Sequence, residues 1–363
     1  MGVKNSELQL LIDTTLPDLP NQEFEVGWDN QDFEFTRIYN NESMKIDGGT
    51  QIERKIMFDE TGNARYRRLF DTDEPSVGNQ MSTITVPWTS IGTNYSWDKQ
   101  EILRNKGNAK GFIDLLQSRR VDGLNSLANL IESRAWKTPN KAADDLNPFG
   151  VPYYITQLTK TQTDAGTVSG FAGTTIVFQD GTTATVAAGV DAATEAKWRN
   201  YAAAYTKIDN AMLKQARIAA MLTNFKPPII INDPANTRTA QKRWYTSSNV
   251  AADLMDLADQ KDDNHKGKEA MGMLTVDAAL VFLNRAPVIF VPQLENADND
   301  PLYFVDFAKF IPVTHEGYWM EEGEAMTDRG QHTTFTVFLD GSHNNLCLNR
   351  RTCGFVLHKA HTS

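Results

Sequence analysis

The chain has 363 residues, of which 40 % are hydrophobic, so it can bury a sizeable core in one large domain or in two to three intimate ones. Its formal net charge is -10 at pH 7 and its sequence pI is about 5.2, which argues against a nucleic-acid-binding protein because phosphate neutralisation needs clustered Lys and Arg. No run of about 18 apolar residues occurs, and the N-terminus has no basic stretch followed by an apolar one. We therefore expect no transmembrane helix, no signal peptide, and synthesis in a cytoplasm.

Residues 1–50 are polar, acidic and poorly periodic. Pro17 and Pro20 interrupt any helix there. Glu23–Val26 and Asp32–Phe35 alternate acidic and apolar residues, which predicts short strands or an extended arm. Such a segment buries little by itself and is expected to be ordered only along another surface.

Residues 51–97 have the pattern of a long two-stranded ribbon, with one arm at 51–58 and a return arm at 81–88. Between the arms lie a turn at 60–63, a basic stretch and an acidic loop with Asp71, Asp73 and Glu74. An isolated ribbon is marginally stable, so it must pack on something else. The opposite charge blocks suit contacts with neighbouring copies, and a solvated hairpin is the alternative.

Residues 108–136 give the strongest helix signal in the chain. Their apolar residues recur at steps of three and four, and Pro139 follows the segment. A second long helix is predicted over 192–224, before Pro227 and Pro228. A further helix is predicted to begin after 233–237 and to carry Trp244 and Tyr245.

The remaining segments are rich in predicted strands and turns. Residues 174–186 predict a hairpin, because Asp180-Gly181 suits the positive φ angles of a tight turn. Residues 259–269 are highly charged and are expected to form a surface loop. Strands are expected at 228–232, 279–283, 287–292 and 301–306, and a final strand pair at 332–339 and 352–358. Helices and strands mix without segregating, so the fold class is α+β.

No catalytic motif is present: the sequence contains no phosphate-binding glycine loop, no Gly-x-Ser-x-Gly and no His-Glu-x-x-His. We predict no catalytic, cofactor-binding or metal-binding residues. Three groups have weak metal alternatives, but ordinary strand residues or a solvated loop explain each of them better. These groups are Cys347, Cys353, His358 and His361; Glu316, Glu321, Glu322 and Glu324; and Asp298, Asn299 and Asp300.

Several short motifs, taken in order over about 270 residues, resemble the major capsid protein of tailed bacteriophages, the Hong Kong 97 type. Two of them look like the family's ribbon return strand and its junction with a long spine helix. The others look like the spine helix itself, a loop with the pattern Asn-x-x-Gly-Leu-Pro, an apolar strand and the C-terminal ending. The motifs stand at Thr85–Trp88, Ser96–Ile102, Asn108–Trp136, Asn147–Ile155, Ala286–Leu294 and Asn349–Leu357.

The resemblance implies five regions: an N-terminal arm at 1–50, an E-loop ribbon at 51–97, a peripheral domain at 98–194 with the spine helix at 108–136, an axial domain at 195–330, and return strands of the peripheral domain at 331–363. It also implies a shell of pentamers and hexamers that encloses double-stranded DNA without reading its sequence. An acidic wall that does not bind its cargo fits that role. Some relatives crosslink a ribbon lysine, but nothing assigns that reaction to Lys55, the only lysine on the ribbon arms.

The function expected from these observations is a head-shell subunit of a virion, assembled in the host cytoplasm, not an enzyme and not bound to a membrane. A separate scaffolding protein, a portal and a decoration protein are possible partners. The residues that we expect at subunit interfaces are the ribbon arginines Arg54, Arg65, Arg67 and Arg68. The alternatives are the shell of an encapsulin-type nanocompartment, which shares the fold, and an α+β hydrolase with a spatially assembled site.

Overall fold

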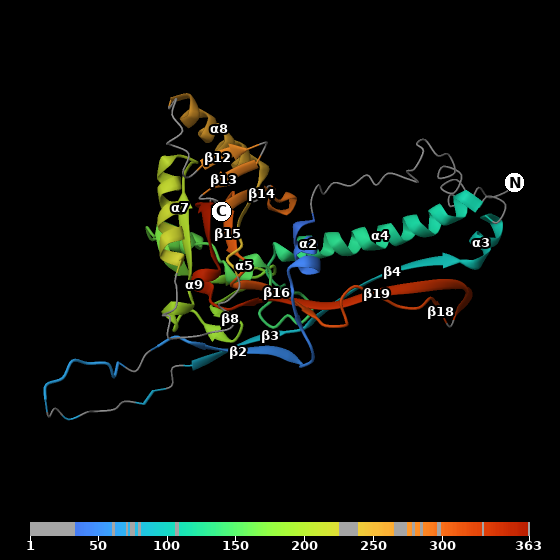
Figure 1. Ribbon diagram of the computed structural model, residues 1–363, viewed down its shortest axis with the longest axis horizontal. Coiled ribbons are helices and arrows are strands. Elements are labelled where there is room, and N and C mark those ends of the chain that lie inside the picture. The colour runs from blue at the N-terminus through green and yellow to red at the C-terminus, as the bar shows by residue number, and fades with distance from the viewer. Residues whose placement is uncertain are drawn as a thin grey trace. The chain divides into compact units, whose positions relative to one another are not determined.

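A computed structural model describes residues 33–59, 62–69, 72, 77–78, 81–105, 109–224, 239–264, 274–277, 280–283, 286–295, 299–328 and 330–361. The chain divides into two compact units, which we describe separately (Figure 1). Unit 1 is built from the described residues of 1–48, 90–133 and 314–343, and unit 2 from those of 49–89, 134–313 and 344–363. Among the described residues, no helix combines the length and the apolar character that a membrane crossing requires.

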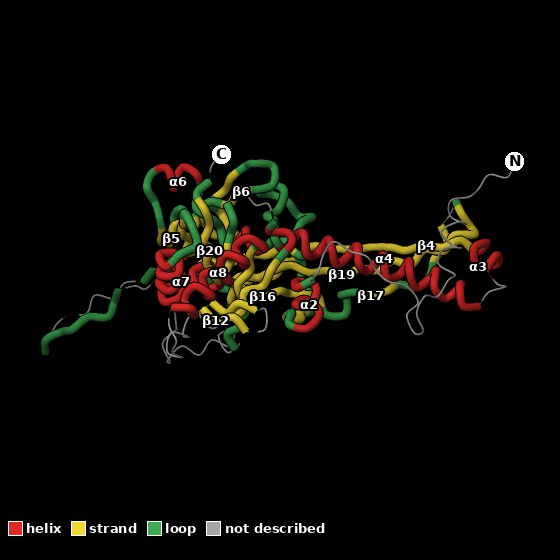
Figure 2. The backbone as a smooth tube through the Cα atoms, turned by 90° about the horizontal axis from the view of Figure 1, so that it is seen from above, coloured by secondary structure: helices red, strands yellow, loops and turns green. Residues whose placement is uncertain are grey.

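Unit 1 combines a long helix with a six-stranded sheet of order β1-β16-β19-β17, in which β4 and β18 also pair with β19. In both Figure 1 and Figure 2, helix α4 runs alongside β4 and β19. The elements are α2 (Glu34–Asn41), β1 (Met44–Ile46), β4 (Thr89–Asp98), α3 (Lys99–Asn105), α4 (Ala109–Ala135), β16 (Phe310–His315), β17 (Glu321–Glu322), β18 (Met326–Asp328) and β19 (Gln331–Cys347).

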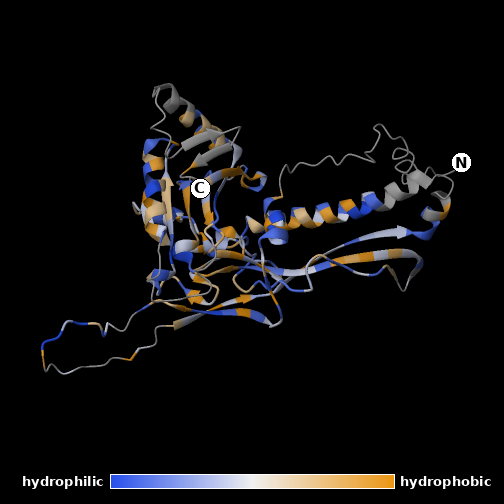
Figure 3. Ribbon diagram, viewed as in Figure 1, coloured by the Kyte–Doolittle hydropathy of each residue, from blue (hydrophilic) through white to orange (hydrophobic). Residues whose placement is uncertain are grey.

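Helix α4 confirms the strongest sequence prediction. Leu127 and Ile131 are buried at the expected spacing of four residues, and hydrophobic and hydrophilic residues alternate along the helix (Figure 3). Leu130, which the same prediction placed on the apolar stripe, is 44 % exposed. Residues spaced by three and four positions do not all point in the same direction around a helix, so Leu130 lies at the edge of the apolar stripe and is partly exposed.

Helix α2 corrects the prediction of a strand or extended arm at Asp32–Phe35. Phe35, Ile38 and Tyr39 follow helical spacing and are almost completely buried. The carboxylate of Glu132 accepts a hydrogen bond of 2.8 Å from the backbone N–H of Phe35, which satisfies one of the free donors at the helix start. The alternation over 32–35 was too short to reveal the helical period that begins there, and residues 1–32 lie outside the described part.

Unit 2 is built on an eight-stranded sheet of order β12-β13-β14-β11-β15-β20-β10-β5. Its strands are β5 (Ser169–Gly173), β10 (Asn200–Tyr205), β11 (Lys242–Thr246), β12 (Leu274–Asp277), β13 (Leu280–Leu283), β14 (Ala286–Phe290), β15 (Leu302–Asp306) and β20 (Gly354–Lys359). The other elements are the ribbon strands β2 (Gln51–Met57) and β3 (Met81–Pro87), helices α5 (Val151–Tyr154), α6 (Lys160–Asp164), α7 (Asn210–Thr223), α8 (Ser248–Asn264) and α9 (Arg350–Cys353), the 3-10 turns η1 (Ala196–Trp198) and η4 (Pro292–Leu294), and the short strands β6 (Ile176–Val177), β7 (Thr183–Ala184), β8 (Val186–Ala187) and β9 (Val190–Asp191).

Both faces of this sheet are covered. On one face Trp244, Phe304 and Phe355 pack together with buried residues of α7 and α8. On the other face the ring of Trp136 contacts Tyr245 and Tyr303 from adjacent strands, with centroid separations of 4.9 and 6.1 Å. A strand buried on two faces has a continuous apolar sequence rather than an alternating one.

This burial on both faces explains why two segments that were predicted as helices are strands of the sheet. The predicted helix 192–224 is strand β10 followed by the shorter helix α7, which Asp209 caps by accepting hydrogen bonds from the N–H groups of Ala211 and Met212. Trp244 and Tyr245, predicted on a helix, lie in β11, a central strand of the sheet. Alanine-rich and aromatic segments without polar alternation are ambiguous between helix and buried strand.

Two smaller predictions are also wrong. Residues 259–264 continue helix α8 instead of forming a loop. The two C-terminal strands exist as β19 and β20, but they belong to different sheets and do not pair with each other. The predicted strand 228–232 lies outside the described residues. The hairpin at 174–186 is confirmed, since β6 pairs with β7 and Gly181 has a φ of 81°.

Candidate subunit interface

The ribbon is formed by β2 and β3, which pair in antiparallel register from Gln51 opposite Pro87 to Met57 opposite Met81. This confirms the two predicted arms. Ile52, Ile84 and Val86 are buried at the base of the ribbon, so this part folds onto unit 2. Beyond Phe58 the ribbon has no such cover among its described residues.

Residues 186–198 hold the base of the ribbon on both arms. The ammonium of Lys197 bonds the carbonyl of Phe58 at 2.5 Å and pairs with the carboxylate of Asp59 at 3.0 Å. The ring of Phe58 packs edge-on against Trp198, with centroids 5.8 Å apart. On the other arm the backbone N–H of Thr85 donates to the carbonyl of Ala188 at 2.9 Å. The start of the ribbon is therefore a fixed part of unit 2.

Large apolar side chains lie exposed further along the ribbon. Tyr66, Leu69 and Val77 are each at least 85 % exposed, and Met57 and Met81, which face each other across the strands, are more than half exposed. Within the described part of the chain these side chains are left uncovered.

The four arginines predicted at interfaces all belong to the ribbon. Arg54 is partly buried within β2, whereas Arg65, Arg67 and Arg68 are exposed in the segment 62–69. The guanidinium of Arg65 donates to the carbonyl of Thr72. The acidic loop residues Asp71, Asp73 and Glu74, which follow them in the sequence, lie outside the described part. The structure thus places three arginines among the exposed apolar residues, and their role at an interface remains a prediction.

The acidic segment Glu316–Glu324 does not gather into one cluster. Glu322 forms a two-pronged pair with Arg120 of α4, at 3.1 and 2.8 Å, and also accepts a hydrogen bond from Tyr95 of β4. The bonds from Arg120 and Tyr95 lower the pKa of the Glu322 carboxyl below its usual value. Glu316, Glu321 and Glu324 are exposed. Among the described residues no group of three or more potential ligands surrounds a metal position.

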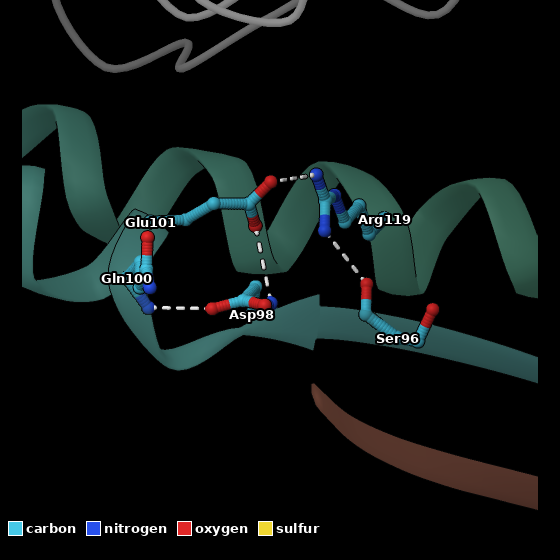
Figure 4. A network of polar contacts seen from close by, with 5 residues as sticks. All are labelled: Ser96, Asp98, Gln100, Glu101 and Arg119. Carbon is cyan, nitrogen blue, oxygen red and sulfur yellow. Dashed lines mark hydrogen bonds and ion pairs between the residues drawn. The ribbon is translucent and has the colours of Figure 1, made fainter. Parts of the chain in front are cut away.

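A polar network fixes the junction where β4 turns into α3 (Figure 4). Arg119 of α4 donates to the carbonyl of Ser96 at 2.7 Å and pairs with Glu101 at 3.0 Å. Glu101 accepts from the N–H of Asp98, and Asp98 accepts from the N–H of Gln100. The network binds the start of α3 to a helix later in the chain, so it aligns the long helix with its sheet.

Sequence analysis missed a buried polar centre around Arg350. The guanidinium is fully buried; its Nε donates to the carbonyl of Tyr154 at 2.8 Å, and one Nη donates to Thr156 and to Asn200 at 3.3 Å each. Burial lowers the pKa of Arg350. Gly173 borders Asn200 so closely that a Cβ there would lie 2.1 Å from its amide oxygen. The only feature of the sequence that pointed to this centre was the position of Arg350 just before the apolar strand Gly354–Lys359.

Comparison with known proteins identifies the fold. No protein-family model and no curated protein matches this sequence. Among solved structures, a chain of the cyanophage A-1(L) capsid asymmetric unit is similar with a TM-score of 0.56 at 13 % identity, covering 96 % of this chain and 97 % of that one. A chain of the capsid of a native GTA particle has a TM-score of 0.55 at 12 % identity, covering 95 % and 96 %. A chain of Mycobacterium phage Bobi has a TM-score of 0.53 at 7 % identity and covers 100 % of both.

The chain therefore has the mixed α/β fold of the Hong Kong 97 type, as the sequence motifs predicted. The similarity extends over nearly its whole length and over nearly the whole of each similar chain.

Proposed function

We propose that this chain is the major capsid protein of a tailed bacteriophage, a subunit that assembles into the icosahedral head shell around double-stranded DNA. The observation that carries the proposal is the fold, shared end to end with capsid chains of the cyanophage and of the GTA particle. The exposed ribbon supports it, since a shell subunit needs surfaces that only neighbouring copies bury. The role requires no catalytic residue.

In this proposal the regions keep their family roles. Residues 1–50 form the N-terminal arm and 51–97 the E-loop, while 98–194 and 331–363 form the peripheral domain and 195–330 the axial domain that gathers in pentamers and hexamers. Assembly takes place in the host cytoplasm, with a scaffolding protein, a portal and a decoration protein as further partners. The mature location is the virion.

Negative-stain electron microscopy of the purified chain, alone and with the scaffolding protein of the same genome, tests the assembly. Rings or closed shells of uniform size support it. A monodisperse monomer under every condition would refute it. The neighbouring genes separate the encapsulin alternative, because terminase and portal genes accompany a phage shell and a cargo enzyme accompanies a nanocompartment.

The ribbon arginines are proposed to form inter-subunit ion pairs, with the acidic N-terminal arm or other acidic residues of a neighbouring copy as partners. Reversing Arg65, Arg67 and Arg68 to Glu makes like charges meet at the interface, and we expect assembly to be lost while the circular dichroism of the subunit is unchanged. A matched control reverses three exposed lysines to Glu, with the same change in net charge: Lys141, Lys160 and Lys207. If the control stops assembly as effectively as the ribbon variant, the arginines have no specific role.

A further inference from the structure

A cavity of about 240 Å³ lies on the face of the eight-stranded sheet that Trp136 covers. Its inner wall contains the buried side chains of Trp136, Leu158 and Tyr303, and the exposed residues Lys137 and Val177 line its outer part. All the described residues that line it belong to unit 2. Because a cavity of about 150 Å³ is sufficient to hold benzene, a ligand with one aromatic ring fits here.

A buried hydroxyl in the inner wall of the cavity has no acceptor for its hydrogen. The amide of Asn299 donates to Oε1 of Gln157, so Nε2 of Gln157 faces Tyr303 and donates to its hydroxyl oxygen at 2.9 Å. Burial raises the pKa of Tyr303 to about 12, so the hydroxyl keeps its hydrogen at neutral pH. Among the described residues nothing accepts that hydrogen. Since buried polar groups are normally hydrogen-bonded, the hydroxyl calls for an acceptor that the described part of the chain does not supply.

The threonine hydroxyls that line the cavity already have partners within the protein. Those of Thr138, Thr156 and Thr159 donate to protein oxygen atoms at 2.8, 2.9 and 3.2 Å, respectively. The hydroxyl of Thr175 lies 3.3 Å from that of the preceding threonine. Of the described hydroxyls in the lining, Tyr303 is therefore the one that is left to donate to a ligand.

The charged side chains that line the cavity are basic. Lys137 and His361 contribute an ammonium and an imidazole, and none of the described lining residues is Asp or Glu. This local charge is opposite to the formal net charge of -10 of the whole chain. A negatively charged ligand is attracted to such a lining, and a carboxylate oxygen also supplies a strong acceptor for the Tyr303 hydroxyl.

We propose that this cavity binds a small aromatic carboxylate. The ring of the ligand packs against Trp136 and Leu158, and one carboxylate oxygen accepts the hydrogen bond from Tyr303. The ammonium of Lys137 balances the charge of the carboxylate. The inference goes beyond the proposed function and does not depend on it, because all the groups that it uses lie within unit 2 of a single chain.

The probe for the experiment is 4-fluorobenzoate, whose binding to the native full-length protein is followed by fluorine NMR of the ligand. We expect saturable binding with a Kd below about 1 mM at low ionic strength. The neutral analogue 4-fluorobenzyl alcohol has the same ring without the charge and should bind about ten-fold more weakly or less. Failure of 4-fluorobenzoate to saturate the protein at about 10 mM would overturn the proposal, as would equal affinities for the two compounds.

Two variants test the assigned contacts. Tyr303→Phe removes the hydroxyl and retains the ring beside Trp136, and we expect the Kd for 4-fluorobenzoate to rise about five-fold or more. Lys137→Met removes the positive charge of an exposed residue, so the Kd should rise several-fold and depend less on salt.

The matched control is Lys207→Met, which removes an exposed lysine that does not line the cavity and should leave the Kd unchanged. If wild type, Tyr303→Phe and Lys137→Met bind 4-fluorobenzoate equally well, the ligand lies elsewhere and the assignment is wrong. Because Lys137 is exposed, its variant decides the question even if Tyr303→Phe does not fold.

Discussion

The variant Gly354→Ala adds a single methyl group inside the core of unit 2 and so tests how closely that core is packed. Gly354 begins β20, whose residues Gly354–Leu357 pair with β15 in the middle of the eight-stranded sheet. A Cβ at this position would lie 2.1 Å from the carbonyl oxygen of Phe304 and 2.5 Å from the Cδ1 atom of Ile155. The first of these atoms belongs to the backbone, so rotation of a side chain cannot relieve the contact.

The expected loss of unfolding free energy can be worked from the atoms that the new Cβ displaces. Overpacking a close-packed core costs about 1–3 kcal/mol. Separating the strands at Gly354 weakens about two ladder hydrogen bonds, at about 1 kcal/mol each. We therefore expect a loss of about 3–5 kcal/mol, a large fraction of the stability of an ordinary domain.

Urea unfolding, followed by the fluorescence of the buried residues Trp198 and Trp244, measures this loss. With a slope of about 3 kcal/mol per M, the midpoint should fall by more than about 1 M. Gly330→Ala is the matched control, because a Cβ at 330 meets no atom within 4 Å, and its midpoint should stay within about 0.2 M of wild type. Equal midpoints for the two variants would refute the packing argument.

Three further predictions concern charge. Burial lowers the pKa of His343 to about 4, below its usual value of about 6.5, so the unfolded chain binds the proton first as the pH falls, and this titration should lower the stability by about 2 kcal/mol from pH 7 to pH 5. In urea titrations His343→Phe should remove that share of the pH dependence, while His358, whose pKa burial also lowers to about 4, keeps its own share. Lys197→Met removes the bonds to Phe58 and Asp59, so limited proteolysis of the ribbon should become several-fold faster while the unfolding free energy falls by less than about 1 kcal/mol. The control Lys207→Met replaces another exposed lysine and should leave the cleavage rate unchanged. Glu322→Gln should cost about 1 kcal/mol or less by weakening the pair with Arg120, and the difference from wild type should vanish in 1 M salt; a difference independent of salt would contradict an electrostatic origin.

The sequence by itself determined the elements whose pattern is local. The three- and four-residue period of helix α4, the paired arms of the ribbon and the Asp180-Gly181 hairpin all depend on residues close along the chain. The order of these elements was sufficient to predict the Hong Kong 97-type fold and to direct attention to the ribbon arginines.

Only the tertiary structure decided the elements whose surroundings come from distant residues. Tyr201–Tyr205 is a strand because Phe355–Lys359, about 150 residues later, pairs with it in parallel. Trp244 and Tyr245 are in a strand because the sheet buries them on opposite faces. Arg350 and Asn200 meet only when the C-terminal strand closes that sheet. Local propensities differ by less than about 1 kcal/mol per residue, so burial, which contributes about 1.5–3 kcal/mol per large side chain, selects the final conformation at such positions.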